Sequence, residues 1–104
     1  MAGELAMETL LITYRVRPDR LDEHLTLLDA VHRDLARLDA PGFRYLTLRL
    51  DDGLSFVDVV MGPELPQPLP SLESFGRFRA GLEERCEQRS TAGFTVLGSY
   101  GMGG

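Results

Sequence analysis

The chain has 104 residues, a formal net charge of −5 and a single cysteine. This length suits one domain, expected over residues 1–104, and one cysteine excludes both an internal disulfide and a paired-thiol metal site. The acidic balance argues against nucleic-acid binding, which needs a clustered positive field. The N-terminal residues contain no basic region and no long apolar run, so we expect neither a signal peptide nor a membrane anchor. The expected location is the cytoplasm.

The first third of the chain predicts a strand followed by a helix. Apolar and polar residues alternate from Thr9 to Arg17, and Pro18 ends the strand. Leucines and a valine then recur every three or four residues up to about Asp39, which is the period of a helix packed on one side. The sequence Ala40-Pro41-Gly42 ends this helix.

A hairpin is predicted next. Residues 43–50 and 54–61 are two apolar segments rich in β-branched and aromatic residues, and Asp51-Asp52-Gly53 between them is a turn signal. Residues 62–70 contain four prolines, so this segment is expected to be a loop.

The last third predicts a second helix and a fourth strand. Ser71 is a suitable N-cap, and the apolar residues of the helix form one stripe that ends at Cys86. Thr91-Ala92-Gly93 is expected to end this helix, and residues 94–100 are expected to form the last strand.

The order strand, helix, strand, strand, helix, strand predicts an α+β fold of the ferredoxin-like β-α-β-β-α-β type. Right-handed connections give it a four-stranded antiparallel sheet with both helices on one face. Neither alternating set of strand residues is polar, so the face without helices needs a cover, and a second copy is the simplest one. A monomer is expected to expose Phe43, Tyr45, Val57 and Val59 together.

Several segments resemble the antibiotic-biosynthesis-monooxygenase-like (ABM) group of the dimeric α+β barrel superfamily. A strand that ends in a basic residue and proline, and a helix that ends in Pro-Gly before an aromatic strand, are typical of that group. The segments that carry this resemblance are Ile12–Pro18, Ala40–Leu46, Phe56–Val60 and Phe75–Phe78. The resemblance covers nearly the whole chain, from Thr9 to Tyr100.

The resemblance implies a homodimer in which two sheets pack into a barrel, with a ligand cleft between each sheet and its helices. Some members oxidise polycyclic aromatic compounds with O₂ and no cofactor, whereas a haem-degrading branch uses Asn, Trp and His together. This chain has no asparagine and no tryptophan, so haem degradation is not expected. The function implied is a cofactor-independent monooxygenase, or a related small-molecule enzyme, acting on an aromatic or polyketide-like compound. The alternatives are a non-catalytic ligand-binding module and a structural dimer of the same fold.

Two histidines fall within the apolar stripe of the first helix. A neutral imidazole at His24 or His32 is suited to act as a base for a phenolic ligand or to orient it; the alternative is a packed histidine with one nitrogen satisfied. Their separation of roughly 12 Å along the helix is too long for both to bind one metal ion.

Three further polar groups lie in apolar surroundings. Arg79 on the second helix is expected either to reach solvent or to bind an anionic ligand or Asp58. Asp58, on a central strand, is expected to form a structural salt bridge with Arg15 or Arg79, and less readily to act as a catalytic acid. Cys86 is expected to be a core residue rather than a nucleophile.

These residues predict a ligand pocket between the sheet and the helices. We expect it to be bordered by His24, Phe56, Phe75 and Arg79, with His32 as a further candidate in the same layer. Arg79 favours a small aromatic or anionic ligand. No metal and no tightly bound cofactor are expected, because no dinucleotide, phosphate or metal-ligand motif is present. A layer completely filled by phenylalanines and leucines is the alternative.

Overall fold

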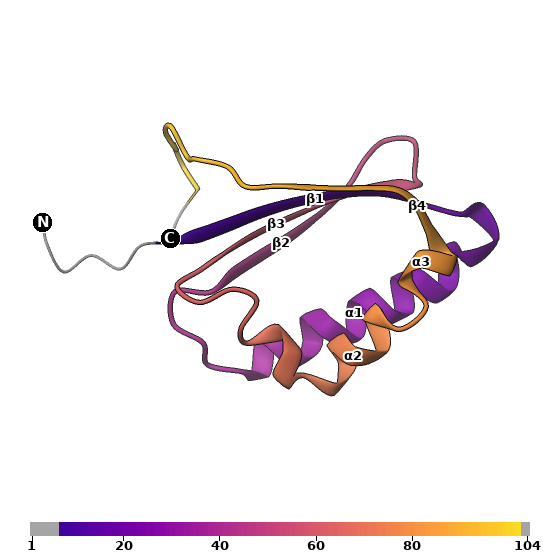
Figure 1. The fold of residues 1–104 in the computed structure, drawn as a ribbon, viewed down its shortest axis with the longest axis horizontal. Helices are drawn as coiled ribbons and strands as arrows, with labels where there is room; N and C mark the ends of the chain where they lie inside the picture. The colour runs from indigo at the N-terminus through magenta and orange to yellow at the C-terminus, as the bar shows by residue number, and fades with distance from the viewer. Residues whose placement is uncertain (1–6, 103–104) are drawn as a thin grey trace, which may run out of the picture.

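A computed structural model describes residues 7–102 of the chain. Figure 1 shows a twisted sheet with all the helices on one of its faces. The strands lie in the order β2-β3-β1-β4, and every neighbouring pair is antiparallel. The elements are β1 (Glu8–Val16), α1 (Leu21–Arg37), β2 (Arg44–Arg49), β3 (Ser55–Gly62), α2 (Glu73–Arg79), α3 (Leu82–Arg85) and β4 (Cys86–Ala92), with short 3-10 turns at Pro18–Arg20 and Leu69–Ser71. The predicted α+β, ferredoxin-like fold is confirmed.

The first half of the chain follows the sequence prediction closely. The turn between β2 and β3 is held by Asp52, whose Oδ1 accepts hydrogen bonds from the backbone N–H groups of Leu54 and Ser55 at 2.9 and 2.8 Å. An aspartate that bonds its own backbone a few residues on is a local turn device, which explains why the turn could be read from sequence. Of the N-terminal segment expected to be neither leader nor anchor, residues 1–6 lie outside the described residues.

The second half contains the main correction. One helix up to about residue 90 and a strand over 94–100 were expected, but α2 ends at Arg79, α3 has four residues, and β4 begins at Cys86. Gly81 adopts a left-handed conformation with φ of 77°, which interrupts the helix. β4 is an edge strand with mostly exposed polar residues, so its sequence lacks the apolar alternation of a half-buried strand.

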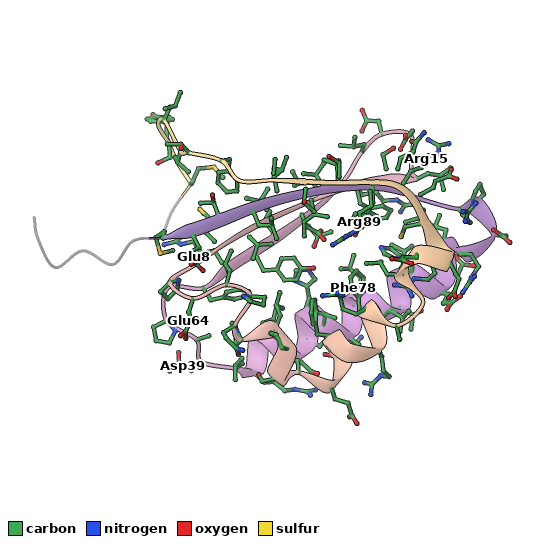
Figure 2. All side chains as sticks on the ribbon, viewed as in Figure 1. Glu8, Arg15, Asp39, Glu64, Phe78 and Arg89 are labelled. Carbon is green, nitrogen blue, oxygen red and sulfur yellow. The ribbon has the colours of Figure 1, made fainter. Side chains whose placement is uncertain are left out.

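The core lies between the sheet and the helices. Its buried members come from β1, β3 and β4, from the helices and from the 3-10 turn at Leu69; they are Tyr14, Val16, Leu28, Val31, Phe56, Leu69, Phe78, Leu82 and Cys86. Tyr14 and Phe56 stack with ring centroids 5.5 Å apart, across β1 and β3. Figure 2 shows Phe78 pointing from α2 towards the sheet.

The sheet face without helices is apolar, although its members differ in part from those expected. Pairing of β2 with β3 places Leu46 opposite Val59, so an even-numbered residue of β2 shares a face with an odd-numbered residue of β3. Val57 and Val59 therefore lie on the outer face as expected, whereas Tyr45 lies on the helix side. Phe43 also packs against the core. The expectation that Phe43 and Tyr45 belong to the outer face is wrong, because the register of the hairpin determines which residues of the two strands lie on the same face.

Candidate functional site

A cavity of about 100 Å³ lies in the layer between the sheet and α2. Its wall is mainly apolar and comes from all four strands, the proline-rich loop and the second helical region. The lining residues are Leu10, Ile12, Tyr14, Tyr45, Asp58, Val60, Leu65, Pro66, Leu69, Phe75, Phe78, Arg79, Leu82 and Arg89. An apolar cavity with a few convergent polar groups is the common form of a small-molecule site.

Asp58 is the buried charged group of the cavity wall. Asp58 is 2% exposed, its Oδ2 accepts a long hydrogen bond of 3.4 Å from the Tyr45 hydroxyl, and its Oδ1 has no hydrogen-bond partner among residues 7–102. Burial raises the pKa of Asp58 from its ordinary 3.8 to about 6, against the smaller opposing effects of Thr47, Tyr45 and Arg89. A buried carboxylate with an open oxygen is therefore a proton acceptor suited to neutral pH.

A bulge in β4 turns a second charge towards the same cavity. Gln88 and Arg89 together lie opposite the single residue Tyr14, and Gln88 has a positive φ of 55°. This extra residue leaves Arg89 on the helix side of the sheet, where it lines the cavity although its side chain is exposed. Figure 2 shows Arg89 pointing from β4 into the layer between sheet and helices. A non-glycine residue in this conformation is strained, and such strain is common beside functional sites.

His24 lies one layer behind the cavity wall. It is fully buried, its Nε2 is 3.2 Å from the Tyr14 hydroxyl, and its Nδ1 accepts a hydrogen bond from Arg85 Nε at 3.3 Å. Burial, and then the nearby Arg85 charge, lower the pKa of His24 to about 4. His24 is therefore neutral at physiological pH, and it contacts the cavity-lining rings of Tyr14 and Phe78 rather than the cavity itself.

His32 lies in a different environment. Its ring stacks on Tyr45 with centroids 4.9 Å apart, and Nε2 is 2.9 Å from Thr47 Oγ1. Burial lowers its pKa. It borders two shallow surface depressions rather than the cavity that contains Asp58.

The structure places only some of the predicted pocket residues at the cavity. Phe75 and Arg79 line the cavity, and the Arg79 guanidinium lies 5.9 Å from the centroid of the Phe75 ring. His24 and Phe56 do not line it, although both contact the Tyr14 ring that does.

Sequence reasoning missed two arginines of this region, Arg85 and Arg89. Both had been placed on a continuous helix, so their proximity to the sheet could not be foreseen. The positive-φ bulge at Gln88 has no sequence signal, because glutamine is not typical of that conformation.

The expected salt bridge of Asp58 is wrong. Among residues 7–102, Asp58 has no cation within ion-pair distance, and Arg15 instead pairs with Asp52 and Glu87 at 3.3 and 3.9 Å. Arg15 and Asp58 lie on opposite faces of the sheet, because Arg15 pairs in register with Ser55, three residues away from Asp58. Cys86 is buried, and burial raises the pKa of its thiol, which fits a core residue.

Two negative observations apply to the described part of the chain. Residues 7–102 contain no group of three histidine, cysteine or acidic side chains arranged to hold a metal ion. Over the same residues, no helix combines the length and the apolar character needed to cross a membrane.

The comparisons with known proteins show similarity in structure only. No protein-family model matches the sequence, and no curated protein sequence matches it. SnoaB, a cofactor-independent oxygenase from Streptomyces nogalater, superposes with a TM-score of 0.65 at 18% identity, over 91% of this chain and 97% of that one. A provisionally assigned antibiotic biosynthesis monooxygenase from Nitrosomonas europaea gives a TM-score of 0.69 at 16% identity, over 93% and 96% of the two chains.

Rv0793 from Mycobacterium tuberculosis is similar to the same degree, with a TM-score of 0.70, 17% identity and coverage of 90% and 98%. At these identities the similarity establishes the fold. The chain therefore has the ferredoxin-like fold of proteins named antibiotic biosynthesis monooxygenases, in agreement with the resemblance seen in the sequence.

Proposed function

We propose that this chain is a small-molecule enzyme, a single domain in which Asp58 takes a proton from an aromatic or enolisable ligand. The observation that carries the proposal is the buried carboxylate with one unpaired oxygen at the wall of an apolar cavity. A buried carboxyl group is stable only when it is protonated and neutral, or when its charged form has a hydrogen-bond partner in the cavity. A ligand that brings an acidic hydrogen to Asp58 supplies this partner.

The cavity volume bears on the size of the ligand. A cavity of roughly 150 Å³ lined by apolar groups holds one benzene molecule. The cavity here, of about 100 Å³, is smaller and therefore takes at most one ring of an aromatic compound, with the rest of the compound outside it. Arg79 and Arg89 lie in that wall and are exposed, so they favour a ligand with a phenolate, enolate or carboxylate group.

The reaction that fits best is oxidation by O₂ without a cofactor, as for the named activity of SnoaB. Removal of a proton from a ring CH₂ that is linked to a carbonyl through aromatic rings gives an enolate, and O₂ adds to that carbon to form a hydroperoxide. Loss of water with the second hydrogen leaves C=O, so one oxygen atom enters the product and the other leaves as water. The substrate supplies all four electrons, and no further reductant is needed. The chain's contribution is the base Asp58 and the dry cavity.

The test uses 1,8-dihydroxyanthrone as probe substrate and ¹⁸O₂ as oxidant. We expect an anthraquinone product that contains one ¹⁸O atom, formed without added cofactor, and a rate at least about 100-fold lower for Asp58→Asn. Asp51→Asn is the matched control, because Asp51 is exposed in the hairpin turn. A rate for Asp58→Asn equal to that of the control would refute the role of Asp58. Tight binding of the probe without turnover would support the alternative of a ligand-binding module.

We further infer that the protein is a homodimer that pairs the outer faces of two sheets, and that it is cytoplasmic. Leu46 and Leu48 on this face are 47% and 43% exposed, and Leu97 and Tyr100 in the C-terminal segment are 96% and 98% exposed. Monomeric proteins rarely leave a continuous apolar face of this kind uncovered.

Sedimentation measures the dimer directly. We expect Val59→Glu to give monomers or unfolded protein, because Val59 lies in the middle of the outer face. Leu38→Glu, at the end of α1, is the control and should leave the dimer intact, since Leu38 is an exposed leucine on the helix side of the sheet and not on the outer face. A stable monomer for the unmodified protein at micromolar concentration would exclude both the dimer and the barrel.

A further inference from the structure

Arg85 is a buried cation whose partners are all neutral. It is 1% exposed, and among residues 7–102 no carboxylate lies within ion-pair distance of it. Its Nη1 and Nη2 donate hydrogen bonds to the carbonyl oxygens of Ala80 and Phe78 at 3.1 and 2.7 Å, and its Nε donates to His24 Nδ1 at 3.3 Å. The break between α2 and α3 supplies one of these carbonyls, so the chain conformation there holds the guanidinium in place.

This arrangement determines which nitrogen of His24 carries the proton. A guanidinium has five N–H donors and no acceptor, and it stays protonated in proteins. His24 Nδ1 must therefore be the unprotonated nitrogen, and a neutral imidazole then has its proton on Nε2. Because Nε2 lies 3.2 Å from the Tyr14 hydroxyl, His24 donates to the Tyr14 oxygen.

The direction of this bond controls Tyr14. Its oxygen already accepts from His24, so its own O–H proton points elsewhere, and within residues 7–102 the hydroxyl has no second hydrogen-bond partner. Tyr14 lines the cavity, and burial, with the charge of Asp58, raises its pKa far above the ordinary range, so the hydroxyl remains a donor.

We propose that Arg85 and His24 are positioning residues that fix Tyr14 as a hydrogen-bond donor to an oxygen of the ligand. This inference rests on the proposed function only for the presence of that ligand. The cavity then presents a donor at Tyr14 and an acceptor at Asp58, which is the pair needed to take a proton and to stabilise the oxygen anion that forms. Without Arg85, the His24 ring is free to take the other tautomer, and Tyr14 can turn its proton towards Nε2 instead.

His32 provides an internal comparison. Its Nε2 lies 2.9 Å from the Thr47 hydroxyl, which can either donate or accept, so nothing in that contact selects a tautomer. The chain has two histidines, and they differ in this respect.

The first experiment is ¹⁵N NMR of the two imidazole rings in the unmodified protein, with His32→Gln used to assign the signals. We expect His24 to be in the Nε2–H tautomer throughout the range from about pH 5 to 8. Arg85→Lys, which can only donate, should keep this tautomer, whereas Arg85→Met should populate the Nδ1–H form. An Nδ1–H tautomer or a charged His24 in the unmodified protein at pH 6 would overturn the inference, even if Arg85→Met does not fold.

The second experiment measures binding of 4-nitrophenol, whose phenolate form absorbs visible light. Tyr14→Phe and Arg85→Met should each bind the phenolate about tenfold more weakly or worse, and Arg85→Lys should bind nearly as the unmodified protein does. A purely structural role of Arg85 would lower the thermal stability of Arg85→Met but leave its phenolate affinity within twofold, which would contradict the proposal. No binding to the unmodified protein would also count against it.

The two hypotheses can fail separately. If Asp58→Asn turns over the anthrone probe at the full rate, the base assignment is wrong, while the His24 tautomer and the loss of phenolate binding in Tyr14→Phe still test the positioning role. If the tautomer is the opposite one, the role of Arg85 and His24 is wrong whatever Asp58 does.

Discussion

Arg85 and Asp58 are the arginine and the acidic residue that the described part of this fold buries almost completely, at 1% and 2% exposure, yet their surroundings differ. Arg85 donates to two carbonyl oxygens and one imidazole nitrogen, whereas Asp58 receives one long hydrogen bond and keeps one oxygen unpaired. A satisfied buried charge holds its neighbours in place. An unsatisfied one costs stability unless a ligand or a proton completes it, and this difference separates the supporting side of the cavity from its reactive side.

Removal of the satisfied charge should have the largest effect on stability. Arg85→Met leaves the carbonyls of Phe78 and Ala80 and His24 Nδ1 without their donor, and each buried orphan costs about 1–3 kcal/mol. We expect the free energy of unfolding, measured in urea, to fall by about 3–5 kcal/mol. A loss below about 1 kcal/mol would mean that water replaces Arg85 and that the contrast with Asp58 does not hold.

Removal of the unsatisfied charge should act in the opposite direction and depend on pH. The folded-state pKa of Asp58, about 6, lies above its ordinary 3.8, so protonation favours the folded state and this stabilisation is lost as the pH rises through 6. Asp58→Asn should therefore raise the free energy of unfolding by roughly 2–3 kcal/mol at pH 7.5 and change it little at pH 4. Equal effects at the two pH values would show that Asp58 is not desolvated.

The same variant isolates the pH dependence of His24. The folded-state pKa of about 4 lies below the ordinary 6.5, so the unfolded chain binds an extra proton between these values and stability falls as the pH drops. In the unmodified protein Asp58 opposes this change, and the two effects nearly cancel between pH 4.5 and 6.5. In Asp58→Asn the loss should appear in full, at roughly 2–3 kcal/mol between pH 7 and pH 4.5. Urea titrations of both proteins across this range measure it, and parallel curves would contradict it.

The smallest expected effect concerns the bulge beside the reactive side of the cavity. Gln88→Gly should relieve the strain of a left-handed conformation and raise the free energy of unfolding by about 1 kcal/mol, with ligand binding unchanged. Ser90→Gly, in the regular part of the same strand, is the matched control and should lower it by about 0.5–1 kcal/mol. A loss in both variants would show that Gln88 has stabilising contacts of its own.

Local patterns were sufficient for the first half of the chain. The strand before Pro18, the leucine repeat of α1 and the Asp52 turn each depend on residues close in sequence, so their structures could be predicted from short segments. The order of elements and the alternation of apolar residues also sufficed for the α+β fold and for an apolar outer face. Of the residues expected to border a pocket, Phe75 and Arg79 line the cavity, whereas His24 and Phe56 do not.

Tertiary structure alone decided the rest, because it depends on register and on contacts between distant residues. The break at Gly81 and the early start of β4 bring Arg85 to His24, 61 positions away in the chain, and the bulge at Gln88 brings Arg89 to the cavity. Pairing of β3 with its neighbours, rather than any motif, leaves an oxygen of Asp58 unpaired. The sequence contains these residues, but only the packed sheet and helices determine which buried charge is satisfied and which remains open to a ligand.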